Sequence, residues 1–138
     1  MKYIIYMSSA IRLMTHDNLL DILTVSRRNN TAKQLTGMLL YGEGTFVQVL
    51  EGEPEVISQT YNIIEKDPRH RNLIVITSGE LEKRNFPDWS MGFKTINHDI
   101  LREFEGFKDI RDDKFLKNSK DHPSLTVLKT FAETNYLL

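Results

Sequence analysis

Residues 35–50 read LTGMLLYGEGTFVQVL, two apolar runs on either side of a short loop that contains glycine. We expect strands at Leu35–Tyr41 and Thr45–Leu50 that form a hairpin around residues 42–44. Successive side chains of a strand point to opposite faces, and in the second strand both faces are apolar. Such a strand needs cover on both sides, so the sequence predicts a sheet that lies between two layers.

The segments around this hairpin complete a familiar order of elements. A strand is expected at Tyr3–Ser8, followed by a helix from a Thr15 cap to about Asn29. After the hairpin and a turn at 51–54, a second helix starts near Pro54 and ends at Asp67-Pro68. Two more strands are expected at Leu73–Thr77 and Trp89–Thr95. The order is β-α-β-β-α-β with an extra strand. We therefore expect an α+β, ferredoxin-like domain with both helices on one face of the sheet.

The C-terminal residues have the spacing of two amphipathic helices. Apolar side chains mark the first at Ile100, Leu101, Phe104 and Phe107, and the second, after Pro123, at Leu125, Leu128, Phe131 and Ala132. We divide the chain into a domain at 1–97 and a helical extension at 98–138. The extension is expected to cover the second face of the sheet or to form an interface.

Composition excludes several classes of function. A length of 138 residues suits one domain, and a net charge of -1 offers no basic field for nucleic acid. The chain has no cysteine, so disulfides, thiolate metal sites and cysteine nucleophiles are excluded. The four histidines stand far apart and predict no metal site. No stretch approaches the roughly 20 apolar residues of a membrane span, and no signal peptide is evident, so we expect a cytoplasmic protein.

Polar residues occupy positions on the first helix where a plain core would be apolar. At about 100° per residue, one face carries Leu19 and Leu23 and then Ser26 and Asn30. Buried polar groups need hydrogen-bond partners. Local partners would suffice if Asn30 capped the helix and Ser26 bonded to the backbone. A ligand beside this face is the other interpretation.

Two further polar residues point to the same region. Gln48 lies between Val47 and Val49 in the middle of a strand, where it could reach water only on an edge strand. Tyr6 could be an ordinary core tyrosine. In a ferredoxin-like sheet, however, the first and third strands are central neighbours, so Tyr6 and Gln48 can face one cleft that Asn30 approaches from the helix. This set suits a flat ring with amide-like edges, such as a flavin.

With these residues in place, the chain resembles the BLUF family, the blue-light sensors that use FAD. The motifs are Tyr6 with Ser8, SRRNN at 26–30, LTG at 35–37, FVQVLEG at 46–52, DPRH at 67–70 and FPDWSM at 86–91. Any one of them could arise by chance, but the ordered set is specific. The resemblance covers residues 1–97, about two-thirds of the chain.

The resemblance implies that FAD is held noncovalently between the two helices and that the chain is a sensor, not an enzyme. It implies photoactive roles for Tyr6 and Gln48 and transmission of the signal by Trp89 and Met91. The implied cofactor contacts are Tyr6, Ser26, Asn29, Asn30, Gln48, Arg69 and His70. Arg69 and His70 would lie near the open side of the flavin, where a cation could meet its phosphates.

The implied mechanism needs no substrate. Tyr6 gives the excited flavin an electron and then a proton, which Gln48 relays. Gln48 then changes its tautomer or orientation and donates a new hydrogen bond to a flavin carbonyl, which shifts absorption to the red. The change reaches the strand that bears Trp89 and Met91. Output is then expected through a separate downstream signalling protein or through the contacts of a homo-oligomer.

Two other functions fit the same fold. A ferredoxin-like regulatory module could bind another small ligand or a protein, although it would leave the set of Tyr6, Gln48 and Asn30 unexplained. An enzyme such as an acyl-phosphate hydrolase would need an anion-cradling loop of backbone N–H groups. Residues 8–12, SSAIR, follow the first strand and lack glycine, so they match such a loop poorly.

Overall fold

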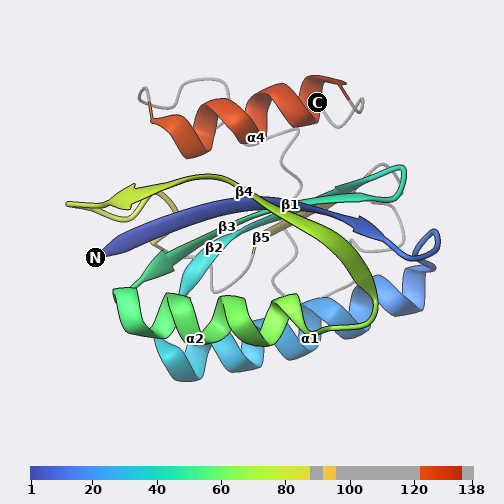
Figure 1. The fold of residues 1–138 in the computed structure, drawn as a ribbon, viewed down its shortest axis with the longest axis horizontal. Helices are drawn as coiled ribbons and strands as arrows, with labels where there is room; N and C mark the ends of the chain where they lie inside the picture. Colours follow the sequence, from blue (N-terminus) through green and yellow to red (C-terminus); the bar gives the residue numbers. More distant parts are fainter. Residues whose placement is uncertain (88–91, 96–121, 135–138) are drawn as a thin grey trace.

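A five-stranded sheet forms the centre of the structure, a computed structural model that describes residues 1–87, 92–95 and 122–134 (Figure 1). Across the sheet the strands are β4 (His70–Glu80), β1 (Lys2–Ala10), β3 (Thr45–Gly52), β2 (Thr36–Gly42) and β5 (Gly92–Thr95). The first four are antiparallel to their neighbours, and β5 pairs with β2 in parallel. The order β4-β1-β3-β2 confirms the ferredoxin-like prediction.

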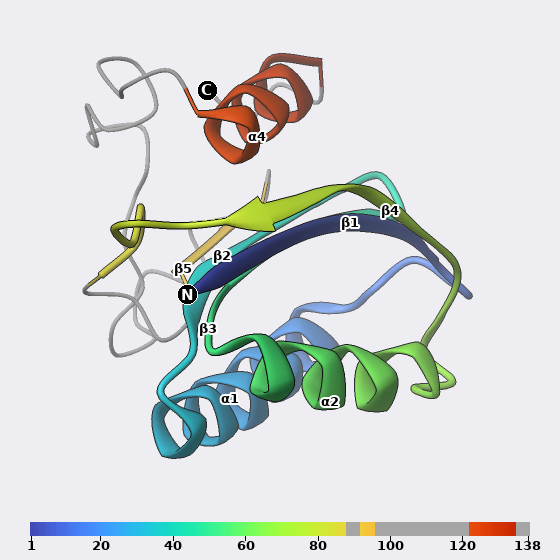
Figure 2. The ribbon, with the colours of Figure 1, turned by 60° about the vertical axis from the view of Figure 1, so that its left-hand side comes forward.

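Helices cover both faces of this sheet. The helices α1 (His16–Lys33) and α2 (Pro54–Glu65) lie side by side on one face, and α4 (Pro123–Thr134) crosses the other (Figures 1 and 2). The layered arrangement predicted from the apolar hairpin is therefore confirmed, with α4 as the cover on the second face. The first predicted tail helix, around Ile100–Phe107, lies outside the described residues.

The hairpin of β2 and β3 depends on glycine at two places. Its loop is the pair Glu43 and Gly44, both with positive φ (47° and 84°), as a two-residue primed turn requires. Within the ladder, a Cβ at Gly37 would overlap the carbonyl oxygen of Val49. Only glycine lets the two strands approach this closely.

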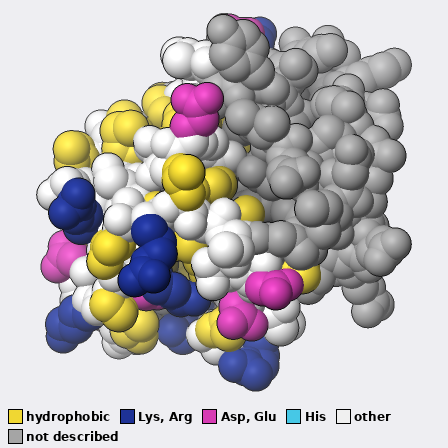
Figure 3. Space-filling model, turned by 90° about the vertical axis from the view of Figure 1, so that its right-hand side faces the viewer, with side chains coloured by type: hydrophobic (Ala, Val, Ile, Leu, Met, Phe, Trp, Pro, Cys, Tyr) yellow, Lys and Arg dark blue, Asp and Glu magenta, His cyan; other side chains and the backbone are white. Residues whose placement is uncertain are grey.

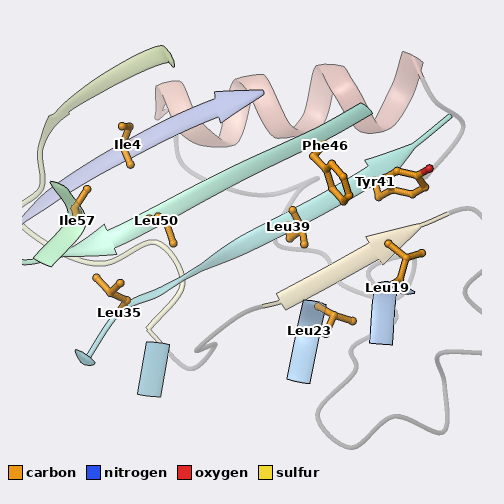
Figure 4. Packing of buried hydrophobic residues seen from close by; sticks show 9 residues of the cluster. All are labelled: Ile4, Leu19, Leu23, Leu35, Leu39, Tyr41, Phe46, Leu50 and Ile57. Carbon is orange, nitrogen blue, oxygen red and sulfur yellow. The ribbon is translucent and has the colours of Figure 1, made fainter. Parts of the chain in front are cut away.

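The side chains of the central strands alternate between two apolar cores. The core on the α1 and α2 side contains Ile4, Leu19, Leu23, Leu35, Leu39, Tyr41, Phe46, Leu50 and Ile57 (Figure 4). The core on the α4 side contains Ile5, Met38, Leu40, Val47, Val49, Phe86, Leu125, Leu128 and Ala132. Gln48 belongs to the first side and is buried between Phe46 and Leu50.

Several boundaries differ from the sequence-based expectations. The helix α1 passes Asn29 and ends at Lys33, because Gln34 adopts a left-handed conformation and its N–H bonds to the Asn30 carbonyl. The strand β4 extends beyond Leu73–Thr77 at both ends because it follows β1 along its whole length. The strand β3 likewise extends into the first half of the turn expected at 51–54 and ends at Gly52. Of the strand predicted at Trp89–Thr95, the described part is β5; Trp89 and Met91 lie outside it.

Candidate functional site

A cleft opens between α1, α2 and the sheet. Its empty space, including the open mouth, is about 900 Å³. Ile22 and Leu39 are among the apolar residues of its wall. The cleft brings together all seven residues predicted as cofactor contacts: Tyr6, Ser26, Asn29, Asn30, Gln48, Arg69 and His70.

Tyr6 and Gln48 lie opposite each other on the central strands β1 and β3. The Tyr6 hydroxyl donates a hydrogen bond to Oε1 of Gln48, and both side chains are buried. Because β3 is flanked by strands on both sides, Gln48 is not an edge-strand residue that reaches water. The pair joins two neighbouring strands at the wall of the cleft.

The Tyr6 phenol is held in its protonated form. Burial is the main cause of a strongly raised Tyr6 pKa, and the charges of Tyr61 and Asp67 raise it further. The Tyr61 ring contacts the Tyr6 ring edge to face, with centroids 5.5 Å apart. At neutral pH the phenol is therefore a hydrogen-bond donor, as the bond to Gln48 requires.

The polar residues of α1 line the cleft over its last two turns. Asn30 is 3% exposed, and its backbone carbonyl accepts the N–H of Leu35 at 2.8 Å. Since the helix continues to Lys33, Asn30 is not the C-cap, and the capping explanation for its presence is wrong. Ser26 is half-buried and Asn29 is exposed.

Arg69 and His70 lie at the C-terminal end of α2, each with partners inside the protein. Arg69 pairs with Asp67 at 2.5 Å, and this hydrogen bond is the main cause of a lowered Asp67 pKa. The His70 ring lies 2.8 Å from Ser8 Oγ through Nδ1 and 2.6 Å from the Ile64 carbonyl through Nε2. A carbonyl only accepts, so Nε2 carries a proton, and Nδ1 of the neutral ring accepts from Ser8.

Three polar residues of the lining were not predicted as contacts by the sequence analysis. Thr60 is buried on α2, and Lys33 Nζ lies 3.5 Å from its Oγ1. Asp67 lines the cleft as well as pairing with Arg69. The available signal was the hydroxyl of Thr60 one helical turn after Ile57, on the buried side of α2. It has the same form as the signal from Ser26 and Asn30 on α1.

A second buried polar cluster lies on the other side of the sheet. Glu51 is fully buried, and its carboxylate accepts the backbone N–H groups of Asn85 (2.8 Å) and Phe86 (2.9 Å). The Thr36 hydroxyl donates to the same carboxylate at 3.2 Å. Arg84 donates to the Glu51 backbone carbonyl at 2.9 Å. Sequence reasoning assigned Glu51 to a turn, whereas it is the anchor of residues 84–86.

The chemistry of the cleft suits an uncharged flat ring better than a metal. The buried amides of Gln48 and Asn30 can each donate and accept hydrogen bonds at one edge of such a ring. The apolar side chains of the cleft wall can pack against its face. Within residues 1–87, 92–95 and 122–134, no group of three or more acidic or histidine side chains could hold a metal ion. Over the same residues, no helix is long and apolar enough to cross a bilayer.

The fold and the cleft define a ferredoxin-like domain with room for a small flat ligand between its helices. The chain belongs to the BLUF family, the sensors of blue-light using FAD, whose model matches residues 1–92.

Known relatives agree with this assignment. The beta subunit of a photoactivated adenylate cyclase from Euglena longa is 32% identical over 106 residues, which are 76% of this chain and 12% of that protein. The dark-state structure of BlrB, a BLUF protein, matches with a TM-score of 0.69 and 25% identity over 99% of this chain and 96% of that one. Klebsiella pneumoniae BlrP1 with FMN and cyclic diGMP matches with a TM-score of 0.65 and 26% identity, over 73% and 29% of the two chains. The chain thus spans about an eighth of the length of the cyclase subunit.

Proposed function

We propose that this chain is a blue-light photoreceptor that binds FAD noncovalently in the cleft between α1 and α2. The observation that carries the proposal is the buried hydrogen bond from Tyr6 to Gln48 at the wall of that cleft. The family description names FAD, whereas one solved relative is named with FMN. Both share the ring that Gln48 and Asn30 would address. Arg69, a cation that lines the cleft, favours the ligand with more phosphate.

The residues of the cleft can divide the binding of a flavin between them. The amides of Asn30 and Gln48 would hydrogen-bond the polar edge of the ring, with Ser26 and Asn29 nearby. Ile22 and other apolar side chains would pack against its face. Arg69 and His70 also line the cleft and would lie near the open side of the flavin, where the Arg69 guanidinium could meet the phosphates.

A bound flavin would supply a ring that absorbs blue light and accepts an electron when excited. Tyr6 would give that electron. A phenol that has lost an electron is strongly acidic, so its proton would leave along the existing bond to Gln48 Oε1. Gln48 cannot keep an extra proton and would pass one from its nitrogen to the ring that has taken the electron. It would be left in a changed tautomer or orientation, with a new hydrogen bond toward the ring.

Output would pass through protein contacts. The strand β3 carries Gln48 and pairs with β2, which in turn pairs with β5. Trp89 and Met91 come directly before β5 in sequence and are the proposed transmitters. They would act on a separate cytoplasmic signalling protein or on the contacts of a homo-oligomer, with residues 98–138 as the extension that presents the change. The domain itself would catalyse no reaction.

The first test is an absorption spectrum of the purified chain, prepared with FAD, in the dark and just after blue light. We expect a flavin spectrum with a small, reversible red-shift that Gln48→Ala and Tyr6→Phe abolish. Tyr41→Phe is the matched control, because Tyr41 is a buried tyrosine outside the cleft, and it should keep the shift. A chain that binds no flavin after reconstitution would contradict the proposal and favour the regulatory module.

A further inference from the structure

The helix α1 lines the cleft with side chains whose polarity rises along the helix. In chain order they are Ile22, Val25, Ser26, Asn29, Asn30 and Lys33. The first two are apolar, the next three are polar and neutral, and the last is a cation. A flavin ring has an apolar edge and a polar edge. The Lys33 end of α1 therefore matches the polar edge, which Asn30, one helical turn before Lys33, would also address.

The side chain of Lys33 reaches from α1 to α2. It is half-buried in the last turn of α1, and its Nζ lies 3.5 Å from Oγ1 of the buried Thr60. An ammonium group carries three N–H donors, and Thr60 accepts one of them. The Lys33 side chain forms no other hydrogen bond and no ion pair with a described residue. Its charge and two of its donors remain for an acceptor in the cleft.

Arg69, which also lines the cleft, carries a charge that acids offset. It pairs with Asp67, and its charge also interacts with that of Asp21 in the second turn of α1. Lys33 is in the last turn, so the two cations lie toward opposite ends of this helix. Figure 3 faces the end of the molecule where α1 begins, and basic and acidic side chains lie near one another there. The Lys33 charge, at the other end of α1, has no such partner among the described residues of the lining.

A cation beside the polar edge of a flavin acts differently on the two redox states of the ring. The oxidised ring is neutral, whereas an added electron places negative charge along the polar edge. The cation therefore stabilises the ring mainly after it has taken the electron. In a cleft that is partly shielded from water, this attraction is stronger than it would be in bulk solvent.

From these features we propose that Lys33 makes the bound ring a better electron acceptor by placing its positive charge at the polar edge. The inference rests on the proposed function, since it takes a flavin as the ligand of the cleft. Asn30 would orient the ring, and Lys33 would set how readily the ring takes the electron from Tyr6. A purely structural lysine would act only on the helix, because a cation in the last turn suits the helix dipole.

The reduction potential of the bound flavin tests this role. Lys33→Met removes the charge and keeps much of the bulk, whereas Lys33→Arg keeps the charge. In the full chain loaded with FAD and titrated with dithionite, Lys33→Met should weaken the binding of reduced relative to oxidised flavin by about tenfold. That ratio corresponds to a fall of about 30 mV in the two-electron potential. Lys33→Arg should keep a potential close to that of the unchanged chain.

Lys66→Met is the matched control. Lys66 is the exposed C-cap of α2 and lies outside the cleft lining, so this change also removes a positive charge from the C-terminal end of a helix. The flavin potential should stay the same. An equal fall for Lys66→Met would overturn the proposal, because any surface charge would then suffice. An unchanged potential in Lys33→Met would overturn it as well.

Riboflavin, which has no phosphate, separates the ring from the phosphates as the group that Lys33 serves. We expect Lys33→Met to leave the dissociation constant of oxidised riboflavin close to its original value. A loss of FAD affinity with an unchanged potential would place Lys33 at the phosphates and overturn the proposal. An unchanged chain that takes up neither flavin would overturn the proposed function and this inference together. The failure of this inference alone is therefore distinguishable.

Discussion

Gln48 and Glu51 lie close together on β3, yet their side chains enter opposite faces of the sheet. Glu51 accepts hydrogen bonds from the backbone of residues 85 and 86 and from Thr36, all inside the protein. Gln48 accepts from Tyr6 and borders a cleft that opens to solvent. The difference teaches that a buried polar residue is a candidate for function when it borders open space. A buried polar residue that the protein encloses serves to hold the fold.

The largest effect should come from separating these two roles by mutation. Glu51→Ala leaves two buried N–H groups without their acceptor, so we expect the free energy of unfolding to fall by about 3 kcal/mol. Gln48→Ala should lower the free energy of unfolding by only about 1 kcal/mol, while abolishing the light-induced red-shift. Urea denaturation and difference spectra measure the two quantities. Equal destabilisation by both substitutions would break the comparison.

Matched truncations in the two cores should sharpen the comparison between the two faces of the sheet. Leu23 on α1 and Leu128 on α4 are both fully buried, and each change to alanine should cost about 3 kcal/mol. Only Leu23→Ala should also weaken flavin retention, because α1 forms a wall of the cleft. Thermal denaturation and flavin titration separate the effects. A comparable loss of flavin from Leu128→Ala would show that the α4 side also shapes the cleft.

The cap of α1 offers a smaller effect. Thr15 accepts the N–H of Asn18, whose side chain accepts the N–H of Thr15 in return. Thr15→Ala should lower the free energy of unfolding by about 1 kcal/mol, measured by urea denaturation. The cap lies at the far end of α1 from Asn30, so the absorption spectrum should not change. A shifted spectrum would mean that a change at the N-terminus of α1 moves the other end of the helix, where Asn30 lines the cleft.

The smallest effect should come from the exposed pair of Asp67 and Arg69. The hydrogen bond from Arg69 lowers the Asp67 pKa below its ordinary value of 3.8. A lowered pKa in the folded state stabilises the fold above the unfolded pKa, and this contribution is lost as the pH falls through the folded pKa. Because the pair is partly exposed, Asp67→Asn should cost less than about 1 kcal/mol at pH 7. The difference between the two proteins should shrink as the pH falls below 3.8 and vanish once the pH is below the folded pKa of Asp67. A gap that persists when Asp67 is protonated in the folded state would implicate another interaction.

The sequence predicted most of the fold because its apolar runs, turn residues and caps all indicated the same order of elements. It also indicated that Tyr6, Gln48 and Asn30 would meet, since that follows from which strands are central. It could not reveal Glu51, because a carboxylate after an apolar strand resembles a solvent-exposed residue, and its partners lie 34 and 35 residues further along. Nor could it give the length of β4, where Asn72 adopts a positive φ inside a strand.

The close contact at Gly37 bears on which sequences can encode this domain. Its missing side chain lets β2 approach the Val49 carbonyl, one residue from Gln48. In a library that varies every position of the hairpin, we expect position 37 to accept almost no replacement, because even alanine would push the strands apart. The close approach at this one position would thus limit how far this part of the family can diverge.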